Sequence, residues 1–223
     1  MLRRKLFIAA AATAVAAMLS GGAFATPTAP RNGAEYTTLK NPQPVQGDGK
    51  KVEVIEFFMY HCPACYALEP AMLEWVKKQG DNITFRRIHL PLTGEKDPET
   101  HLFLTLEAMK LESQLHAKVL QTWHVERKRL QSDEANIEWA VKNGIDKEKF
   151  LAVYNSFAIN TRLKNAGRVA ASYEVNSTPT LIVNGRYLTN PSMVDAANPG
   201  IPRQQLTAAT LQVLDALVAQ SRK

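Results

Sequence analysis

The chain has 223 residues, of which 45% are hydrophobic and 22% charged, and its formal net charge is +6. This composition is typical of a globular protein, long enough for one domain with an insertion or for two small domains. Three basic residues and no acidic residue precede position 26, so residues 26–223 carry a formal charge of only +3. A charge this small gives no indication of nucleic-acid binding.

The first 25 residues have the pattern of a secretory signal peptide. The basic start MLRRK is followed by an uncharged run over residues 6–19 and by the small-x-small sequence AFA, which ends at Ala25. A membrane anchor is the alternative, but a span needs about 20 strongly apolar residues, and this run is shorter and rich in alanine. We therefore expect export, with cleavage after Ala25.

The next segments predict a strand, a helix and a second strand. Residues 26–50 are rich in Pro, Gly, Asn and Gln and predict an exposed arm, in which EYTTLK contributes a short strand. KVEVIEFFMY is almost continuously apolar, which is typical of a strand buried on both faces. After Cys62 the apolar residues recur at three- and four-residue steps as far as Gly80, which predicts a helix with Pro63 in its first turn. NITFRRIHL predicts a further strand, although its alternation slips at the two arginines.

Residues 91–160 have a helical pattern throughout. Phe150, Tyr154 and Phe157 form the last apolar stripe of this block, and we expect them to face a core. The charge run ERKR at residues 126–129 is expected to be a solvated helix face.

The C-terminal part predicts a helix over residues 159–173, a hairpin in TPTLIVNGRYLT and a last helix that begins at Pro202. The Asn-Gly pair between two apolar runs is a strong hairpin signal. Taken in order, the elements predict one mixed α/β core that is interrupted by a helical domain.

Cys62 and Cys65 are the only cysteines, and they lie where the long apolar strand passes into the helix. A helix N-terminus stabilises negative charge, so we expect the pKa of Cys62 to be lowered. Cys65 lies one turn further on, on the apolar side, where it is shielded but close enough to form a ring with Cys62. One exposed acidic thiol and one shielded thiol are what dithiol–disulfide exchange requires.

Metal binding and haem attachment have little support in the sequence. A closed zinc site needs four Cys or His ligands, and the five histidines show no paired spacing. Covalent haem attachment needs His directly after the second cysteine, where this chain has Tyr66. We therefore expect no metal, and no cofactor apart from the Cys62–Cys65 disulfide itself.

The segments VIEFFMYHCPACYALEP and STPTLIVNGRYLTNP, with the helical block between them, resemble the DsbA family of periplasmic thiol:disulfide oxidoreductases. The resemblance covers essentially all of the chain after the leader and implies a thioredoxin-like fold with an inserted all-helical domain. The expected division is a signal peptide (1–25), an N-terminal arm (26–50), a thioredoxin-like domain (51–92 and 161–223) and an inserted helical domain (93–160).

The resemblance also implies roles for individual residues. Cys62 is the nucleophile that forms a mixed disulfide with the substrate, and Cys65 is the resolving thiol. Pro179 matches the family's cis-proline, and Thr178 before it lines the site opposite the cysteines. Glu56 matches an acidic position of the family, where burial would raise its pKa and let it relay a proton for Cys65. An ordinary ion pair is the alternative for Glu56.

The residues around the two cysteines include one departure from the family. Pro63 and Ala64 separate the cysteines, and the family commonly has His where this chain has Ala64. Alanine supplies neither a hydrogen-bond donor nor a positive charge, so we expect Cys62 to be less acidic than in relatives with Cys-Pro-His-Cys. His61 flanks the pair on the other side and either compensates or is simply exposed. Glu69 matches a second acidic position, with a solvated helix residue as the alternative.

Two tyrosines flank the motif: Tyr66 follows the second cysteine, and Tyr60 lies at the mouth of the helix. Tyr60 is expected to contribute to an apolar patch that receives unfolded chains.

The leading hypothesis is an enzyme that donates its disulfide to reduced or unfolded exported proteins. The resemblance implies reoxidation by a quinone-linked membrane partner of the DsbB type, and we expect a monomer. The first alternative is a reductase or isomerase that is kept reduced in the periplasm, which Ala64 and Thr178 favour. The second is a non-enzymatic chaperone or metal carrier that uses the thiols as ligands.

Overall fold

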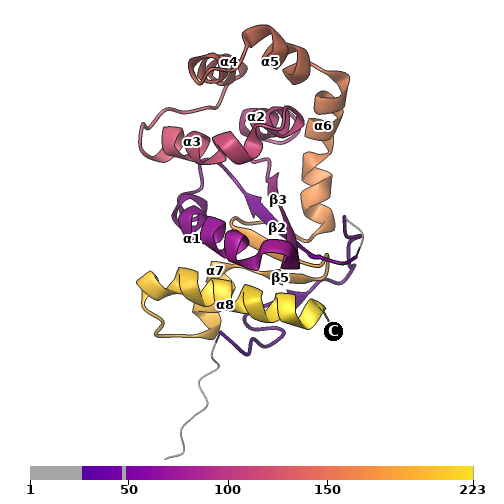
Figure 1. Cartoon of the computed structure of the whole chain (residues 1–223), viewed down its shortest axis with the longest axis vertical. Helices are drawn as coiled ribbons and strands as arrows, with labels where there is room; N and C mark the ends of the chain where they lie inside the picture. Colours follow the sequence, from indigo (N-terminus) through magenta and orange to yellow (C-terminus); the bar gives the residue numbers. More distant parts are fainter. Residues whose placement is uncertain (1–26, 47–48, 223) are drawn as a thin grey trace, which may run out of the picture.

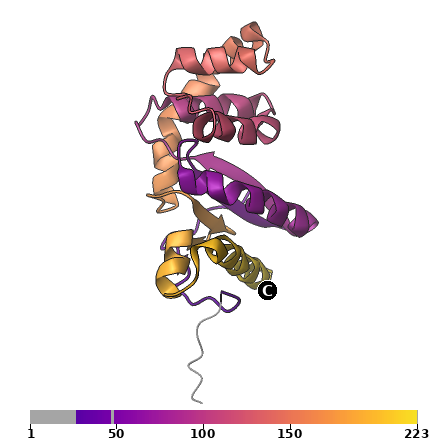
Figure 2. The ribbon, with the colours of Figure 1, turned by 90° about the vertical axis from the view of Figure 1, so that its left-hand side faces the viewer.

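The structure is a computed structural model, and it describes residues 27–46 and 49–222. The predicted signal peptide lies outside the described residues. Figure 1 shows a helical lobe at one end of the molecule, a sheet in the middle and helix α8 toward the other end. The view in Figure 2, turned by 90°, shows the same sequence of layers.

A five-stranded sheet lies at the centre, with the strand order β1-β5-β4-β2-β3. The strands are β1 (Thr37–Thr38), β2 (Val52–Phe58), β3 (Ile83–His89), β4 (Thr180–Val183) and β5 (Tyr187–Thr189). β2 pairs in parallel with β3 and antiparallel with β4, and β5 pairs antiparallel with both β4 and β1. The predicted strands are confirmed, and every residue of β2 is buried, as its apolar sequence predicted.

The helices that the structure describes surround this sheet and form the lobe above it. They are α1 (Pro63–Gln79), α2 (Pro98–Ala108), α3 (Glu112–His124), α4 (Asp133–Lys142), α5 (Lys147–Tyr154), α6 (Phe157–Ser172), α7 (Pro191–Ala197) and α8 (Arg203–Ser221), with a single 3-10 turn over Gly80–Asn82. Helix α1 is capped at its C-terminus by Gly80, as predicted. The short helix α7 was not predicted, although Asn190 and Pro191 form a capping residue and a favoured first helical residue.

The two faces of the sheet are covered by different helices, because successive residues of a strand point to opposite sides. Val54 of β2 packs in a core formed with α1 and α8. Ile55 and Phe57 pack in a second core, with Ala170 and Tyr173 at the end of α6. Strand β2 therefore lies between two hydrophobic layers, which holds its last residues in a fixed position at the start of α1.

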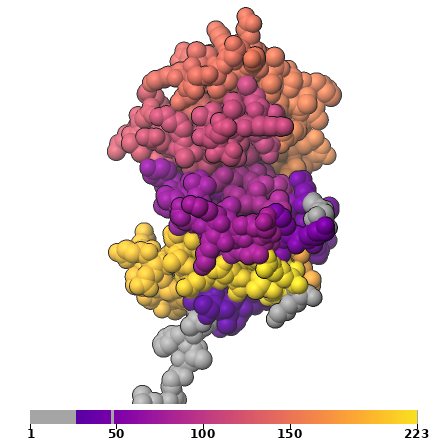
Figure 3. Space-filling view, viewed as in Figure 1, coloured from indigo at the N-terminus to yellow at the C-terminus, as the bar shows by residue number. Residues whose placement is uncertain are grey.

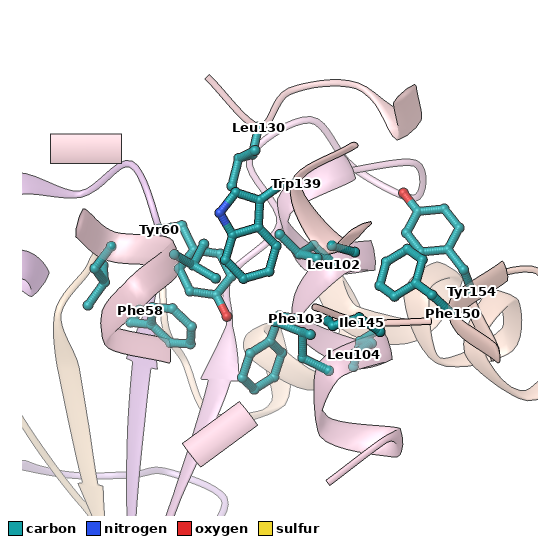
Figure 4. Packing of buried hydrophobic residues seen from close by; sticks show 14 of the residues in the cluster. Phe58, Tyr60, Leu102, Phe103, Leu104, Leu130, Trp139, Ile145, Phe150 and Tyr154 are labelled. Carbon is teal, nitrogen blue, oxygen red and sulfur yellow. The ribbon is translucent and has the colours of Figure 1, made fainter. Parts of the chain in front are cut away.

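Helices α2 to α5 and the first half of α6 form the helical lobe, which Figure 3 shows as a separate upper part of the surface. One hydrophobic core fills the lobe, and Figure 4 shows it extending from Phe58 and Tyr60 to Phe150 and Tyr154. Because Phe58 comes from β2, the lobe packs directly on the end of that strand. The domain boundaries expected at residues 93 and 161 stay a prediction.

Two predictions for this lobe were wrong. Phe157 does not face the core: it is 87% exposed, because it is the first residue of α6 and precedes the positions that pack inward. The run at residues 126–129 is exposed but not helical, since it lies in the loop between α3 and α4. Arg127 in this loop has a φ of 55°, which is outside the helical region and interrupts the helix.

Within residues 27–46 and 49–222, no helix is both long enough and apolar enough to cross a membrane.

The hairpin between β4 and β5 provides a test of the fold at a single residue. Asn184 and Gly185 have φ values of 53° and 60°, as a two-residue hairpin turn requires. A Cβ atom on Gly185 would lie 2.2 Å from the carbonyl oxygen of Gln43, whose N–H donates to the Gly185 carbonyl.

We expect Gly185→Ala to lower the free energy of unfolding by about 3 kcal/mol, because it combines left-handed strain with a backbone clash. Gly94→Ala is the matched control, since Gly94 also has a positive φ but a Cβ atom there would meet nothing within 4 Å, and it should lose only about 1 kcal/mol. Urea unfolding followed by tryptophan fluorescence measures both values. Equal losses would contradict the contact with Gln43.

Candidate active site

Cys62 lies where strand β2 passes into helix α1, and its sulfur caps the helix. The N–H of Cys65 donates to Cys62 Sγ at 3.2 Å, so the sulfur takes the place of the side-chain oxygen that usually accepts this bond. The helix dipole favours negative charge at the same point. Cys62 is only 6% exposed, which is less than predicted, and Cys65 is 2% exposed.

The two thiols, both free in the structure, have pKa values that are displaced in opposite directions. A hydrogen bond from the Cys65 thiol lowers the pKa of Cys62 to about 6 against the effect of burial, and Thr178 and the backbone amides of Cys65 and Ala64 lower it further. The same hydrogen bond, followed by burial, raises the pKa of Cys65. At pH 7 a thiol with a pKa of about 6 is about nine-tenths thiolate. The site therefore holds a thiolate beside a protonated thiol.

Thr178 and Pro179 lie opposite Cys62, and the peptide bond between them is cis, as the resemblance implied. The carbonyl oxygen of Thr178 lies 3.5 Å from Cys62 Sγ and accepts a hydrogen bond from it only when Cys62 is protonated. The hydroxyl of Thr178 is buried without a hydrogen-bond partner among the described residues, and Thr178 is one of the groups that lower the pKa of Cys62. The structure thus brings both cysteines, Thr178 and Pro179 together.

A cluster of buried charges lies between β2, β3, α1 and α3. Arg87 of β3 donates to Glu56 at 3.1 Å, to Glu69 at 3.0 Å and to Glu112 at 3.2 Å. Glu56 and Arg87 are register partners in the parallel pair of β2 and β3, so the sheet itself sets this contact. The negative charge of Glu56 contributes to the raised pKa of Cys65, which connects the cluster to the redox pair.

Glu56 is buried with a raised pKa and is also ion-paired. Burial raises the pKa of Glu56 to about 7, although the charge of Arg87 opposes the shift. Because one guanidinium serves three carboxylates, the cluster is most stable when one of the carboxyl groups holds a proton. Glu56 is therefore ion-paired and is also poised to exchange a proton near neutral pH.

The alternative for Glu69, a solvated helix residue, was wrong. Glu69 is 4% exposed, because α1 turns this side chain toward Arg87 and His116. Burial alone would raise the pKa of Glu69, but the hydrogen bond with His116 and the charge of Arg87 outweigh burial and lower it.

His61 is half-buried and paired with a carboxylate rather than simply exposed. Its Nδ1 lies 2.8 Å and 2.9 Å from the two carboxylate oxygens of Glu99 in α2, and its backbone N–H donates to the same group at 3.1 Å. The hydrogen bond to Glu99 raises the pKa of His61, and the neighbouring Cys62 thiolate adds to the effect. The protonated form of the histidine that precedes the nucleophilic cysteine in the chain is thereby favoured.

Two tyrosines near the cysteines differ in exposure. Tyr66 is 37% exposed, and its ring stacks on His124 at a centroid distance of 4.7 Å. Tyr60 is fully buried, so the prediction that it adds to an exposed apolar patch was wrong. Its backbone is held on both sides, because its N–H donates to His89 and its carbonyl oxygen lies 2.9 Å from His124 Nε2. Pro63 and Ala64 are exposed at the start of α1.

Sequence reasoning missed Arg87, Glu99 and Glu112, the residues that pair with the expected site residues. The sequence did contain an indication of Arg87, since two arginines interrupt the apolar–polar alternation of a predicted strand. Arg86 and Arg87 pair with Glu53 and Glu56 on opposite faces of β2, which explains the interruption. Glu99 and Glu112 lie on helices whose packing against the site is not evident from their spacing.

The residues that the structure describes contain no group of three or more His, Cys, Asp or Glu side chains arranged to hold a metal ion.

Comparisons with known proteins place this site in context. A family model described as Thioredoxin matches residues 11–200. The thiol:disulfide interchange protein DsbA of Burkholderia cepacia is 35% identical over 203 residues, which is 91% of each chain. DsbA of Pseudomonas aeruginosa is 37% identical over 190 residues, or 85% of each chain. The crystal structure of P. aeruginosa DsbA superposes with a TM-score of 0.73 at 36% identity, covering 85% of this chain and 93% of that chain.

The fold, the Cys62–Cys65 pair and these similarities define a thiol:disulfide oxidoreductase with a thioredoxin-like fold. Within that class, the chain belongs to the DsbA family. The fold class and the disulfide-exchange activity predicted from the sequence are confirmed.

The raised pKa of Glu56 predicts a specific dependence of stability on pH. Because the folded protein holds this proton more tightly than an unfolded chain with a pKa of 4.5, stability is lost as the pH rises from 4.5 through about 7. Glu56→Gln removes this loss. We expect the variant to gain about 3 kcal/mol over the wild type between pH 4.5 and pH 8, as measured by urea unfolding of the reduced proteins.

The control for this experiment is Glu74→Gln, at an exposed position of the same helix that bears Glu69. A difference between Glu56→Gln and the wild type that stays constant with pH would show that folding does not change the pKa of Glu56 and would contradict the account.

Proposed function

We propose that this protein donates the Cys62–Cys65 disulfide to reduced or unfolded proteins newly exported to the periplasm. The observation that carries the proposal is the opposite displacement of the two thiol pKa values. A stabilised thiolate at Cys62 lowers the free energy of the reduced protein, and a more stable reduced form makes the disulfide a stronger oxidant. The hydrogen bonds at the start of α1 therefore favour donation over reduction.

The proposed reaction has two exchange steps. A substrate thiolate attacks Cys62 Sγ, the Cys62–Cys65 bond breaks, and Cys65 leaves with the electron pair while a mixed disulfide forms. A second thiolate of the substrate then attacks the substrate sulfur of the mixed disulfide and releases Cys62 as a thiolate. The substrate gains one disulfide, and the protein is left with two reduced cysteines.

The first exchange step also requires a proton, because the pKa of the departing Cys65 is raised. Cys65 leaves as a thiolate in a buried position where its pKa is raised, so it takes up a proton at neutral pH. Glu56 has a pKa of about 7, and its charge acts on Cys65. We assign Glu56 the relay of this proton, with Arg87 and Glu69 as positioning residues.

We also assign the ion pair of His61 and Glu99 a part of the role that the family's usual histidine has between the cysteines. Ala64 occupies that position and supplies no charge. His61 is adjacent to Cys62 in the chain, and Glu99 holds its ring at 2.8 Å in a site where its pKa is raised. A cation next to a thiolate stabilises it.

The proposal also covers the compartment in which the protein acts, the protein that reoxidises it and its oligomeric state. The signal-peptide pattern of the first 25 residues supports export to the periplasm, with cleavage after Ala25. A quinone-linked membrane protein of the DsbB type would reoxidise the pair, and the protein would act as a monomer without any further cofactor.

Stoichiometric oxidation of a reduced, unfolded protein tests the proposed direction. We expect one substrate disulfide to form for each oxidised protein consumed, as counted by free-thiol titration. Cys62→Ser should abolish the reaction. Cys65→Ser, oxidised with a substrate that has a single cysteine, should accumulate the mixed disulfide on Cys62, because neither Cys65 nor a second substrate thiol can release it. Reduction of substrate disulfides by the reduced protein, without the converse reaction, would contradict donation.

The proposed role of His61 predicts the pKa of Cys62 in two variants. His61→Asn should raise this pKa by about 1 unit, because a nearby cation is lost. Adding Ala64→His to the same variant should lower it again by restoring a positive charge on the other side of the sulfur. The pH dependence of the thiolate ultraviolet absorbance measures both values. An unchanged pKa in His61→Asn would contradict the assignment, whatever its effect on stability.

A further inference from the structure

A cleft of about 660 Å³ lies in the helical lobe between α3, α4 and the loop that joins them. Its charged lining consists of four cations and two acids, which are Lys118, Glu126, Lys128, Arg129, Glu138 and Lys142. The volume is within the range of about 300–1,000 Å³ that is usual for small-molecule sites. No step of disulfide exchange uses this cleft.

The positive charges in the cleft exceed what its own acids neutralise. Glu126 already pairs with Lys128 at 3.2 Å and with Lys118 at 3.6 Å. Arg129 and Lys142 form no ion pair among the described residues. With four cations against two carboxylates, the lining carries a formal charge of +2.

Two of the cations lie side by side. The side chains of Lys128 and Lys142 interact closely, and this interaction lowers the pKa of Lys142 while it raises the pKa of Lys128, which Glu126 raises further. Like charges at short range repel unless an anion lies between them or water screens them. An anion that accepts hydrogen bonds from both groups would turn this repulsion into an attraction.

The floor of the cleft is apolar and continuous with the core of the lobe. Trp139 and Leu130 line it, and both belong to the buried core of the lobe, as the close-up in Figure 4 shows. The indole N–H of Trp139 donates to the hydroxyl of Thr122 at 2.9 Å, which fixes the ring against α3. Around this base, Lys118 and Lys142 extend from α3 and α4, and Lys128 and Arg129 come from the loop that joins the two helices.

We propose that this cleft binds a phosphate group, carried either by a small soluble phosphate ester or by an anionic lipid headgroup. A phosphate monoester dianion matches the formal charge of +2, whereas a single carboxylate would neutralise only half of it. Phosphate oxygens accept charge-assisted hydrogen bonds from several Lys and Arg groups at once. The site does not depend on the proposed direction of disulfide exchange.

Calorimetric titration of the whole protein at low ionic strength tests the site, with inorganic phosphate and glycerol 3-phosphate as soluble probes. Vesicles of phosphatidylglycerol, compared with vesicles of phosphatidylcholine, form the lipid arm. We expect saturable binding in one of the two arms. Binding of the soluble probes identifies a free ester as the ligand, and binding of phosphatidylglycerol vesicles alone identifies a lipid headgroup.

The variant that tests the location is Arg129→Gln combined with Lys142→Gln. The matched control is Lys77→Gln combined with Lys78→Gln, which removes the same charge from exposed positions at the end of α1. We expect the cleft variant to bind at least about tenfold more weakly, because charge-assisted hydrogen bonds are lost, and the control to bind like the wild type. None of the four substituted residues takes part in disulfide exchange. Disulfide-exchange activity therefore verifies that both variants fold.

The absence of saturable binding in both arms would overturn the proposal. Equal weakening in the cleft variant and the control would also overturn it, because the binding would then reflect only the net charge of the protein.

Discussion

The hydrogen bond from the N–H of Cys65 to the sulfur of Cys62 is the contact on which the rest of the site depends. It makes the nucleophilic sulfur the cap of helix α1, so the geometry that starts the helix also stabilises the thiolate. Strand β2 is held between two hydrophobic cores, and it delivers Cys62 to this position directly from its end. The helical lobe encloses Cys65 in the same core as Phe58, which keeps the second thiol protonated.

The electrostatics of the site are built in two layers, and neither is evident from the Cys-x-x-Cys motif alone. The register of β2 and β3 places Glu56 opposite Arg87, so a backbone pairing decides where the buried proton is held. Nearer the surface, α2 contributes Glu99, which holds His61 beside the nucleophile. The inserted helices therefore supply charge partners for the redox pair as well as covering it.

Local sequence patterns predicted most of the fold, because the elements concerned can be recognised from the residues of one short segment. The continuous apolar run of β2, the change of period after Cys62 and the Asn-Gly hairpin each depend on a few neighbouring residues. The predictions that failed concern contacts between distant segments: Glu69 is buried because Arg87 and His116 face it, and Tyr60 is buried by the lobe. The site residues that were missed, such as Glu99, carry no local signal, since only tertiary packing brings them to the cysteines.

The reduction potential of the Cys62–Cys65 disulfide tests the central claim most directly. Equilibration in glutathione buffers at pH 7, followed by quantification of free thiols, gives its value. If the capped thiolate stabilises the reduced protein, the potential should lie above about −200 mV, well above the cytosolic glutathione pool. A value near about −270 mV, as in reducing thioredoxins, would contradict a disulfide donor and would mean that the helix cap does not stabilise the thiolate enough.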